Sequence, residues 1–107
     1  MPAYNKLVRD KIPDIIRQDG KTCRVRTLSL AEMKPMLQAK LQEEAAEYLG
    51  SATDSLALEE LADILEVIGA LARLHGAGME QLADIQKSKQ SARGGFDRAV
   101  FLIDVSD

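Results

Sequence analysis

The spacing of apolar residues divides the chain into helical segments separated by short turns. Helical periodicity predicts two long helices, one from Ser29 to about Leu49 and one that runs to about Leu74 after a cap at Asp54 or Ser55. Shorter helices are predicted over 8–18 and 79–91. Because only a few residues separate the two long helices, we expect them to pack as antiparallel neighbours. The pattern therefore predicts an all-α fold, an antiparallel helical bundle of four to five helices.

The start of the first long helix matches a capping box, in which a cap residue and the residue three positions later bond reciprocally. Ser29 stands at the cap position, and the Glu32 side chain is expected to reach back to the Ser29 amide. Two other segments carry strand-like patterns. Thr22–Leu28 is rich in β-branched residues, and 98–105 contains a continuous apolar run. Paired with each other, they would add a minor two-stranded sheet from residues 22–28 and 98–105 at one end of the bundle.

The predicted helix that ends near Leu74 is apolar around nearly its whole circumference. A helix of this kind is buried, and a monomer of 107 residues has difficulty burying one completely. The pattern therefore predicts a homo-oligomer, either a helical dimer or a larger assembly. The apolar positions are Leu56, Leu58, Leu61, Ile64, Leu65, Val67, Ile68, Leu71 and Leu74.

Composition and charge narrow the function classes. The 107 residues are interpreted as one domain, 1–107, because smaller pieces could not bury a core. A net charge of −3 gives no support to a DNA-binding or membrane-surface protein, since both usually carry a basic excess. A single cysteine and a single histidine argue against disulfide or zinc chemistry. Without a leader pattern or an apolar run of about 18 residues, the expected location is cytoplasmic.

Acidic residues recur at one spacing on both long helices. Glu43-Glu44-x-x-Glu47 on the first helix is matched by Glu59-Glu60-x-x-Asp63 on the second, so antiparallel packing would aim these carboxylates at one volume. Like charges four residues apart destabilise a helix, and no lysine or arginine stands four residues after these positions. Solvated charged faces are the commoner use of such runs. A bound cation is the competing interpretation, because it would relieve the repulsion.

The chemistry of the acidic residues indicates which cation and which substrate class fit. Oxygen ligands without histidine or cysteine favour a hard ion, Mg²⁺ or Mn²⁺. Mg²⁺ in proteins usually keeps coordination positions open for water and for substrate phosphates. On this interpretation the partner is a polyphosphate.

Three motifs in the same order resemble a known family, the all-α nucleoside triphosphate pyrophosphohydrolases of the MazG-like superfamily. The segment Lys40-Leu41-x-Glu43-Glu44-x-x-Glu47 followed by Glu60-x-x-Asp63 is similar to the EExxE…ExxD signature of that family. The opening Tyr4-Asn5-Lys6-Leu7-Val8-Arg9-Asp10-Lys11-Ile12-Pro13 and the later Lys87-x-Lys89-x-x-x-Arg93-Gly94-Gly95-Phe96 resemble its short house-cleaning and phosphoribosyl-ATP pyrophosphohydrolase-like branch.

The resemblance implies hydrolysis of a nucleoside triphosphate to the monophosphate and pyrophosphate, with Mg²⁺, or Mn²⁺ in its place, as the cofactor. It implies Glu44, Glu47, Glu60 and Asp63 as metal ligands. Glu43 is then the candidate to orient or deprotonate the attacking water. A homodimer or homotetramer is implied as well. Two alternatives stay open: a phosphoribosyl-ATP pyrophosphohydrolase, and a non-catalytic helical dimerisation or regulatory module.

Basic residues near both ends of the chain are candidates for contact with substrate phosphates. Solvated lysines and arginines on a helix face are the commoner case. The two glycines after Arg93 favour the later group, since they permit close backbone approach to an anion. The candidates are Lys6, Arg9, Lys11, Lys87, Lys89 and Arg93.

Overall fold

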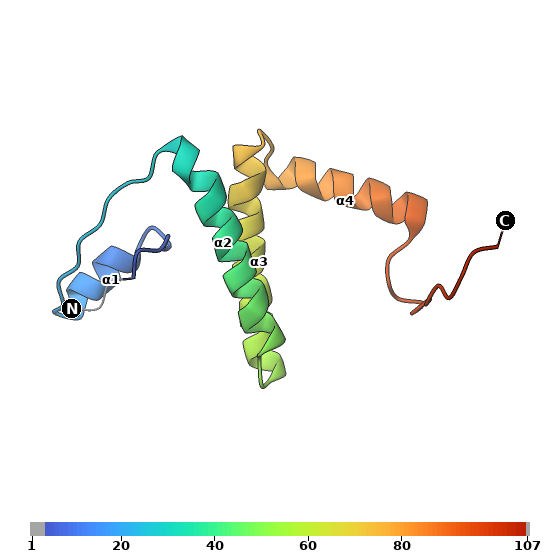
Figure 1. The fold of residues 1–107 in the computed structure, drawn as a ribbon, viewed down its shortest axis with the longest axis horizontal. Helices are drawn as coiled ribbons and strands as arrows, with labels where there is room; N and C mark the ends of the chain where they lie inside the picture. The colour runs from blue at the N-terminus through green and yellow to red at the C-terminus, as the bar shows by residue number, and fades with distance from the viewer. Residues whose placement is uncertain (1–3, 107) are drawn as a thin grey trace.

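The computed structural model describes residues 4–106, which form four helices (Figure 1): α1 (Ile12–Gln18), α2 (Leu30–Leu49), α3 (Asp54–Leu74) and α4 (Met79–Arg93). The predicted all-helical class is confirmed. Helices α2 and α3 lie side by side as an antiparallel pair, called here the α2–α3 hairpin. Helix α4 turns away from this hairpin, so close antiparallel packing within one chain is limited to α2 and α3.

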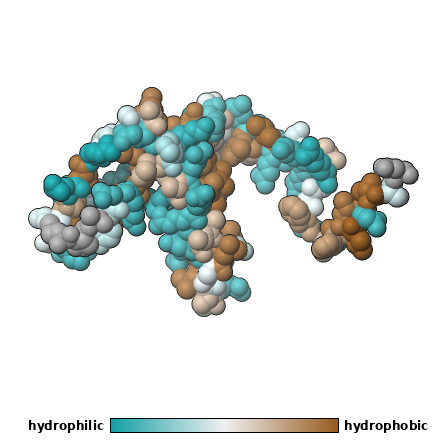
Figure 2. Space-filling model, viewed as in Figure 1, coloured by the Kyte–Doolittle hydropathy of each residue, from teal (hydrophilic) through white to brown (hydrophobic). Residues whose placement is uncertain are grey.

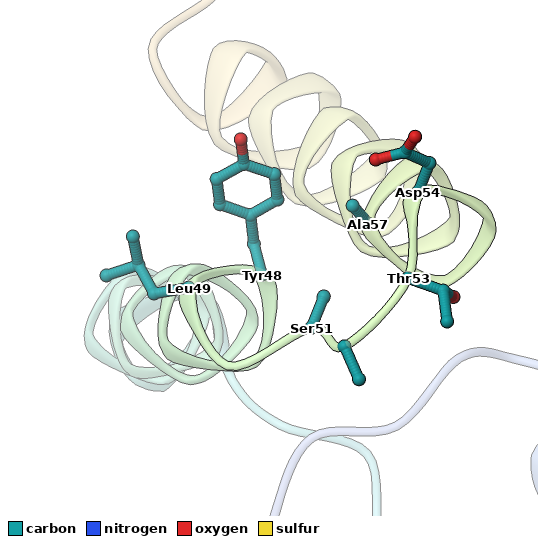
Figure 3. A pocket seen from close by; sticks show the side chains of 7 residues that line it. Tyr48, Leu49, Ser51, Thr53, Asp54 and Ala57 are labelled. Atoms are coloured by element: carbon teal, nitrogen blue, oxygen red, sulfur yellow. The ribbon is translucent and has the colours of Figure 1, made fainter.

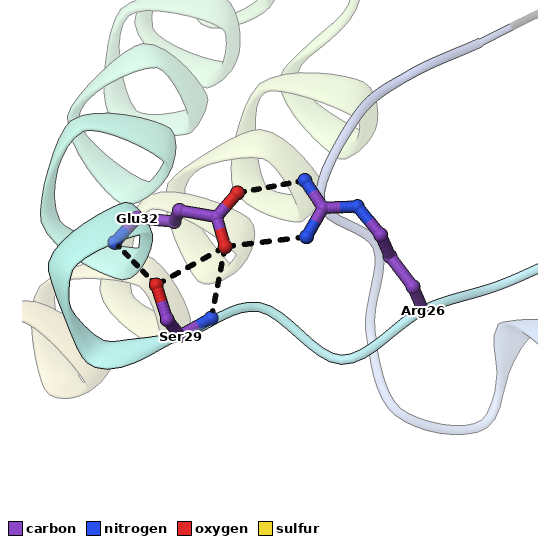
Figure 4. A network of polar contacts seen from close by, with 3 residues as sticks. All are labelled: Arg26, Ser29 and Glu32. Atoms are coloured by element: carbon purple, nitrogen blue, oxygen red, sulfur yellow. Dashed lines mark hydrogen bonds and ion pairs between the residues drawn. The ribbon is translucent and has the colours of Figure 1, made fainter.

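Local sequence signals explain where the helices begin. The Ser29 and Glu32 capping box forms as predicted: the Ser29 side chain accepts a hydrogen bond from the Glu32 amide, and the Ser29 amide donates to the Glu32 carboxylate (Figure 4). Arg26 adds two hydrogen bonds to that carboxylate, of 2.7 and 3.2 Å. These bonds, first from Arg26 and then from Ser29, lower the pKa of Glu32 to about 2. Helix α3 is capped one residue earlier than predicted, by Thr53, whose hydroxyl accepts from the Leu56 amide.

The minor sheet does not form in the part of the chain that the structure describes. Residues 22–28 and 98–105 contain no strand; the first leads into α2 and the second follows α4. Figure 1 shows these segments on opposite sides of the hairpin. A strand is stabilised by hydrogen bonds to a partner strand, so two segments that never meet remain irregular despite their β-branched and apolar residues.

The molecule is elongated. Its radius of gyration over Cα atoms is 18.4 Å and its extents are 63 × 35 × 25 Å, whereas a compact domain of 100 residues has a radius of gyration of about 13 Å. Helix α4 contacts α3 through its first residues: a Cβ added at Gly69 would lie 3.2 Å from the Met79 sulfur. The rest of α4 and the segment after it extend away from this contact (Figure 1).

Burial within one chain is slight. Among the described residues, the hydrophobic side chains that are buried are Leu37, Val67 and Ala72, and none of them is fully enclosed. The apolar character of α3 led us to expect a helix that is buried all round. Within one chain it is not, because among the described helices only α2 and the start of α4 pack against it. Figure 2 shows hydrophobic surface beside the hairpin and along the C-terminal segment. The exposed apolar residues of α3 and of the segment after α4 include Leu58, Leu61, Leu65, Phe96, Phe101 and Ile103.

None of the helices in the described ranges combines the length and the apolar character that crossing a membrane requires.

Candidate functional site

Three of the four predicted metal ligands meet between the helices of the hairpin. Glu44 and Glu47 come from α2 and Glu60 comes from α3, and one carboxylate oxygen from each lies within 4.8 Å of the others. Spacing of three residues places Glu44 and Glu47 on the same face of α2, and the antiparallel turn brings that face against the first half of α3. We call these three residues the carboxylate cluster.

The carboxylate cluster is partly shielded from solvent. Glu44 is 7% exposed, and the Oε2 atoms of Glu44 and Glu60 are buried without a hydrogen bond from the protein. Burial first, and then the neighbouring carboxyl groups of Glu44 and Glu47, raise the pKa of Glu60 to about 7. Buried carboxylate oxygens without donors are costly. The arrangement therefore favours either a proton on Glu60 or a cation among the three side chains.

Two ammonium groups border the carboxylate cluster on the α2 side. Lys40 Nζ lies 3.5 Å from Glu44 Oε1 and 3.6 Å from Glu43 Oε2. Lys6 Nζ approaches Glu43 from the N-terminal arm (residues 4–11) at 3.9 Å. Glu43 thus lies beside the cluster, a step round the helix from Glu44, where its carboxylate faces two cations.

Asp63, the fourth predicted ligand, is not in the carboxylate cluster. Its Oδ1 lies 2.6 Å from Nη2 of Arg9, whose Nη1 is 3.9 Å from Glu66 Oε1. Arg9, a predicted phosphate contact, pairs with Asp63 across 54 positions of sequence, and its contact with phosphate stays a prediction. The acidic residues of α3 therefore have different neighbours. Glu60 faces α2, while Asp63 and Glu66 bind the N-terminal arm.

The other predicted phosphate contacts lie elsewhere. Lys11 is the exposed cap residue of α1. Lys87, Lys89 and Arg93 belong to α4, which points away from the hairpin (Figure 1). Among the residues that the structure describes, no ion pair joins any of these four side chains to the carboxylate cluster.

The sequence interpretation missed Lys40 as a neighbour of the site. The prediction considered only cations that stand four residues after each acidic residue. Lys40 stands four residues before Glu44 and three before Glu43. Helix pairs form in either direction, so this signal was present in the sequence. The acids of α2 are therefore less isolated from positive charge than their own spacing suggested.

A surface hollow of about 560 Å³ lies at the turn of the hairpin (Figure 3). Figure 3 shows the Tyr48 ring and the Asp54 carboxylate on the same side of this turn. No member of the carboxylate cluster lines the hollow, so it is adjacent to the candidate site along α2 rather than part of it.

The residues present fit a hard divalent cation. The donor set is made of oxygen atoms only, which Mg²⁺ and Mn²⁺ prefer. The two unpartnered buried oxygens are positions that such an ion would satisfy. Because Glu60 holds a proton up to about pH 7, a cation that binds there would release it.

Comparison with known proteins gives one partial relative and no family. No protein family and no solved structure matches the chain. An uncharacterized protein of Mycolicibacterium smegmatis is 50% identical over 54 residues, which cover 50% of this chain and 55% of that protein. The chain thus spans about half the length of the relative it matches. The resemblance to the MazG-like superfamily stays a prediction.

Proposed function

We propose that the protein is a Mg²⁺-dependent nucleoside triphosphate pyrophosphohydrolase with a role in clearing unwanted nucleotides. The observation that carries the proposal is the carboxylate cluster, which gathers three acidic side chains from two helices around unpartnered buried oxygens. A solvated charged face would not bury Glu44 to 7% exposure. The proposal also agrees with the motif order that resembles the MazG-like superfamily.

Glu44, Glu47 and Glu60 would hold the cation, with Asp63 as a further ligand. When bound, Mg²⁺ or Mn²⁺ would neutralise triphosphate charge and make phosphorus more electrophilic. Lys6, which contacts Glu43 beside the cluster, and Arg9, once released from Asp63, would be candidates to contact the outer phosphates. A nucleotide substrate also agrees with the expected cytoplasmic location.

Glu43 is the candidate general base, because its carboxylate lies beside the cluster and between Lys6 and Lys40. In the reaction, the oxygen of a water molecule attacks the α-phosphorus and the bond from that phosphorus to the α–β bridging oxygen breaks. Glu43 accepts the proton that the water loses. The products are a nucleoside monophosphate and pyrophosphate.

The proposed active form is a homodimer or homotetramer. Leu58, Leu61 and Leu65 on α3 are 66%, 44% and 54% exposed in one chain. Monomeric proteins rarely leave such contiguous apolar surface open. A second copy of the same hairpin would cover it while leaving the carboxylate cluster, which lies between α2 and α3, free to bind.

The direct experiment is a pyrophosphate-release screen of the full chain across standard and damaged nucleoside triphosphates and phosphoribosyl-ATP, with and without Mg²⁺ or Mn²⁺. We expect metal-dependent release that Glu47→Gln abolishes and Glu80→Gln, on α4, leaves intact. Release from phosphoribosyl-ATP alone would favour the biosynthetic alternative. No release and no metal-dependent thermal shift would reject the enzyme in favour of a regulatory or dimerisation module.

A further inference from the structure

The N-terminal arm lies across the acidic faces of both helices of the hairpin. Lys6 contacts Glu43 on α2 at 3.9 Å, and Arg9 bridges Asp63 and Glu66 on α3 at 2.6 and 3.9 Å. The arm therefore places fixed positive charges beside a site that itself attracts positive charge. Such charges compete with any cation that approaches the same carboxylates.

Asp63 is the carboxylate for which this competition matters most. It stands three residues after Glu60 on α3, and side chains at that spacing are surface neighbours with Cβ atoms about 5–6 Å apart. A change of side-chain rotamer at Asp63 is therefore enough to turn its carboxylate from Arg9 toward the carboxylate cluster. In the present structure the Asp63 carboxylate is paired with Arg9 and is not part of the cluster.

The contact between Arg9 and Asp63 is short but not enclosed. The two side chains are 56% and 38% exposed, and ion pairs open to water contribute little because solvent screens them. Arg9 also borders a shallow hollow of about 300 Å³ beside Leu65 and Met79, so its guanidinium has open space to move into. A permanent clamp would be expected to be buried, whereas this contact can exchange.

We propose that Arg9 is a positioning residue that controls access of Asp63 to the metal. Without a divalent cation, Arg9 keeps Asp63 and Glu66 paired to the N-terminal arm. When the cation enters the carboxylate cluster, Asp63 leaves Arg9 and becomes its fourth carboxylate ligand. The inference rests on the proposed function, because it takes the cluster to be a cation site.

The test measures binding of Mn²⁺ alone to the metal-free full chain, by calorimetry or by the electron paramagnetic resonance of free Mn²⁺. Arg9→Gln should bind Mn²⁺ about threefold to fivefold more tightly than the parent, the gain expected when an exposed ion pair no longer competes. Arg17→Gln is the matched control. Arg17 is similarly exposed, it pairs with Asp14 within α1, and its loss changes the net charge equally.

Two further variants separate exchange at Asp63 from a general charge effect. Arg9→Lys keeps the positive charge but loses the planar guanidinium group. Its affinity for Mn²⁺ should lie between those of Arg9→Gln and the parent. In an Asp63→Asn background, Arg9→Gln should give no gain, because no carboxylate remains to be released. A gain that persists there, or that Arg17→Gln reproduces, would overturn the proposal.

The outcomes also distinguish this inference from the proposed function. Binding of Mn²⁺ by the parent with equal or weaker binding by Arg9→Gln rejects the exchange at Asp63 and leaves the metal site standing. Absence of Mn²⁺ binding by the parent rejects both.

Discussion

The α2–α3 hairpin and the region that follows it are held in place by different means. The hairpin has a capping box at the start of α2, a threonine cap on α3, and the buried apolar side chains of Leu37, Val67 and Ala72. Helix α4 begins at Gly78 without a side-chain cap and has no buried residue. The hairpin is therefore stabilised within one chain, while α4 and the C-terminal segment offer apolar surface that their own chain does not cover.

The proposed chemistry is confined to the hairpin, whereas exposed apolar surface is found both on α3 and after α4. Every member of the carboxylate cluster lies on the hairpin, together with Glu43 and Lys40. The residues after Gly94 contribute exposed aromatic and aliphatic side chains instead, with Phe96 97% and Ile103 88% exposed. We therefore expect substitutions of the acidic residues of the hairpin to affect catalysis. Substitutions of exposed apolar residues, on α3 as well as after α4, are expected to affect association.

Among variants that retain the metal, the largest effect on turnover is expected at Glu43. Glu43→Gln should lower kcat by about 10²–10⁴-fold, the usual contribution of a general base, because the amide cannot accept the proton of the attacking water. Mn²⁺ binding should be retained, unlike in Glu47→Gln. Steady-state kinetics measure the loss of kcat, and metal titration measures the retained Mn²⁺ binding, with Glu80→Gln on α4 as the control. A parallel loss of metal affinity would place Glu43 among the ligands.

The next largest effect is expected on the free energy of unfolding, from substitutions in the core of the hairpin. Leu37 is 4% exposed, so Leu37→Ala should reduce the free energy of unfolding by about 2–5 kcal/mol through lost burial and a residual cavity. Ile85 on α4 is 48% exposed, and Ile85→Ala should cost about 0.5 kcal/mol or less. Denaturant unfolding of both variants gives the comparison. Equal losses would mean that α4 is as well packed as the hairpin, contrary to the structure.

Association through α3 is expected to be sensitive to charge. Leu65→Asp should weaken self-association by about 2 kcal/mol or more, or roughly thirtyfold, if Leu65 lies in the centre of the interface. Leu30→Asp is the matched control, because Leu30 is 81% exposed at the start of α2, where a negative charge suits the helix dipole. Sedimentation at several concentrations measures the effect. A parent protein that stays a folded, active monomer at micromolar concentration would contradict the proposed assembly.

The smallest effects are expected at the helix starts. Ser29→Ala should cost about 1 kcal/mol, because the Glu32 amide loses its acceptor. Conversely, Gly78→Ser should stabilise α4 by a few tenths of a kcal/mol, since nothing lies within 4 Å of an added Cβ there. Thermal unfolding of the two variants measures both shifts. A gain at position 78 as large as the loss at Ser29 would indicate that α4 relies on its cap as much as α2 does.

The parts of the structure that followed from the sequence are those set by local spacing. The capping box depends on Ser29 and Glu32 alone, and the meeting of Glu44, Glu47 and Glu60 depends on two helical repeats and a short turn. The pairing of Arg9 with Asp63 joins segments that are distant in sequence, so no local pattern could predict it. The segments 22–28 and 98–105 had suitable residues for strands, but pairing depends on tertiary placement, which their sequences do not contain.

Helix α4 is joined to α3 by a contact between its first residue, Met79, and Gly69. The Met79 sulfur lies 3.2 Å from where a Cβ at position 69 would be. Met79 is the first residue of a helix of 15 residues, which is about 22 Å long. A methyl group introduced by Gly69→Ala would crowd the Met79 sulfur, which belongs to a flexible side chain. Position 69 thus has little room for a side chain, and solution scattering of Gly69→Ala would show whether Met79 alone moves or α4 changes its direction.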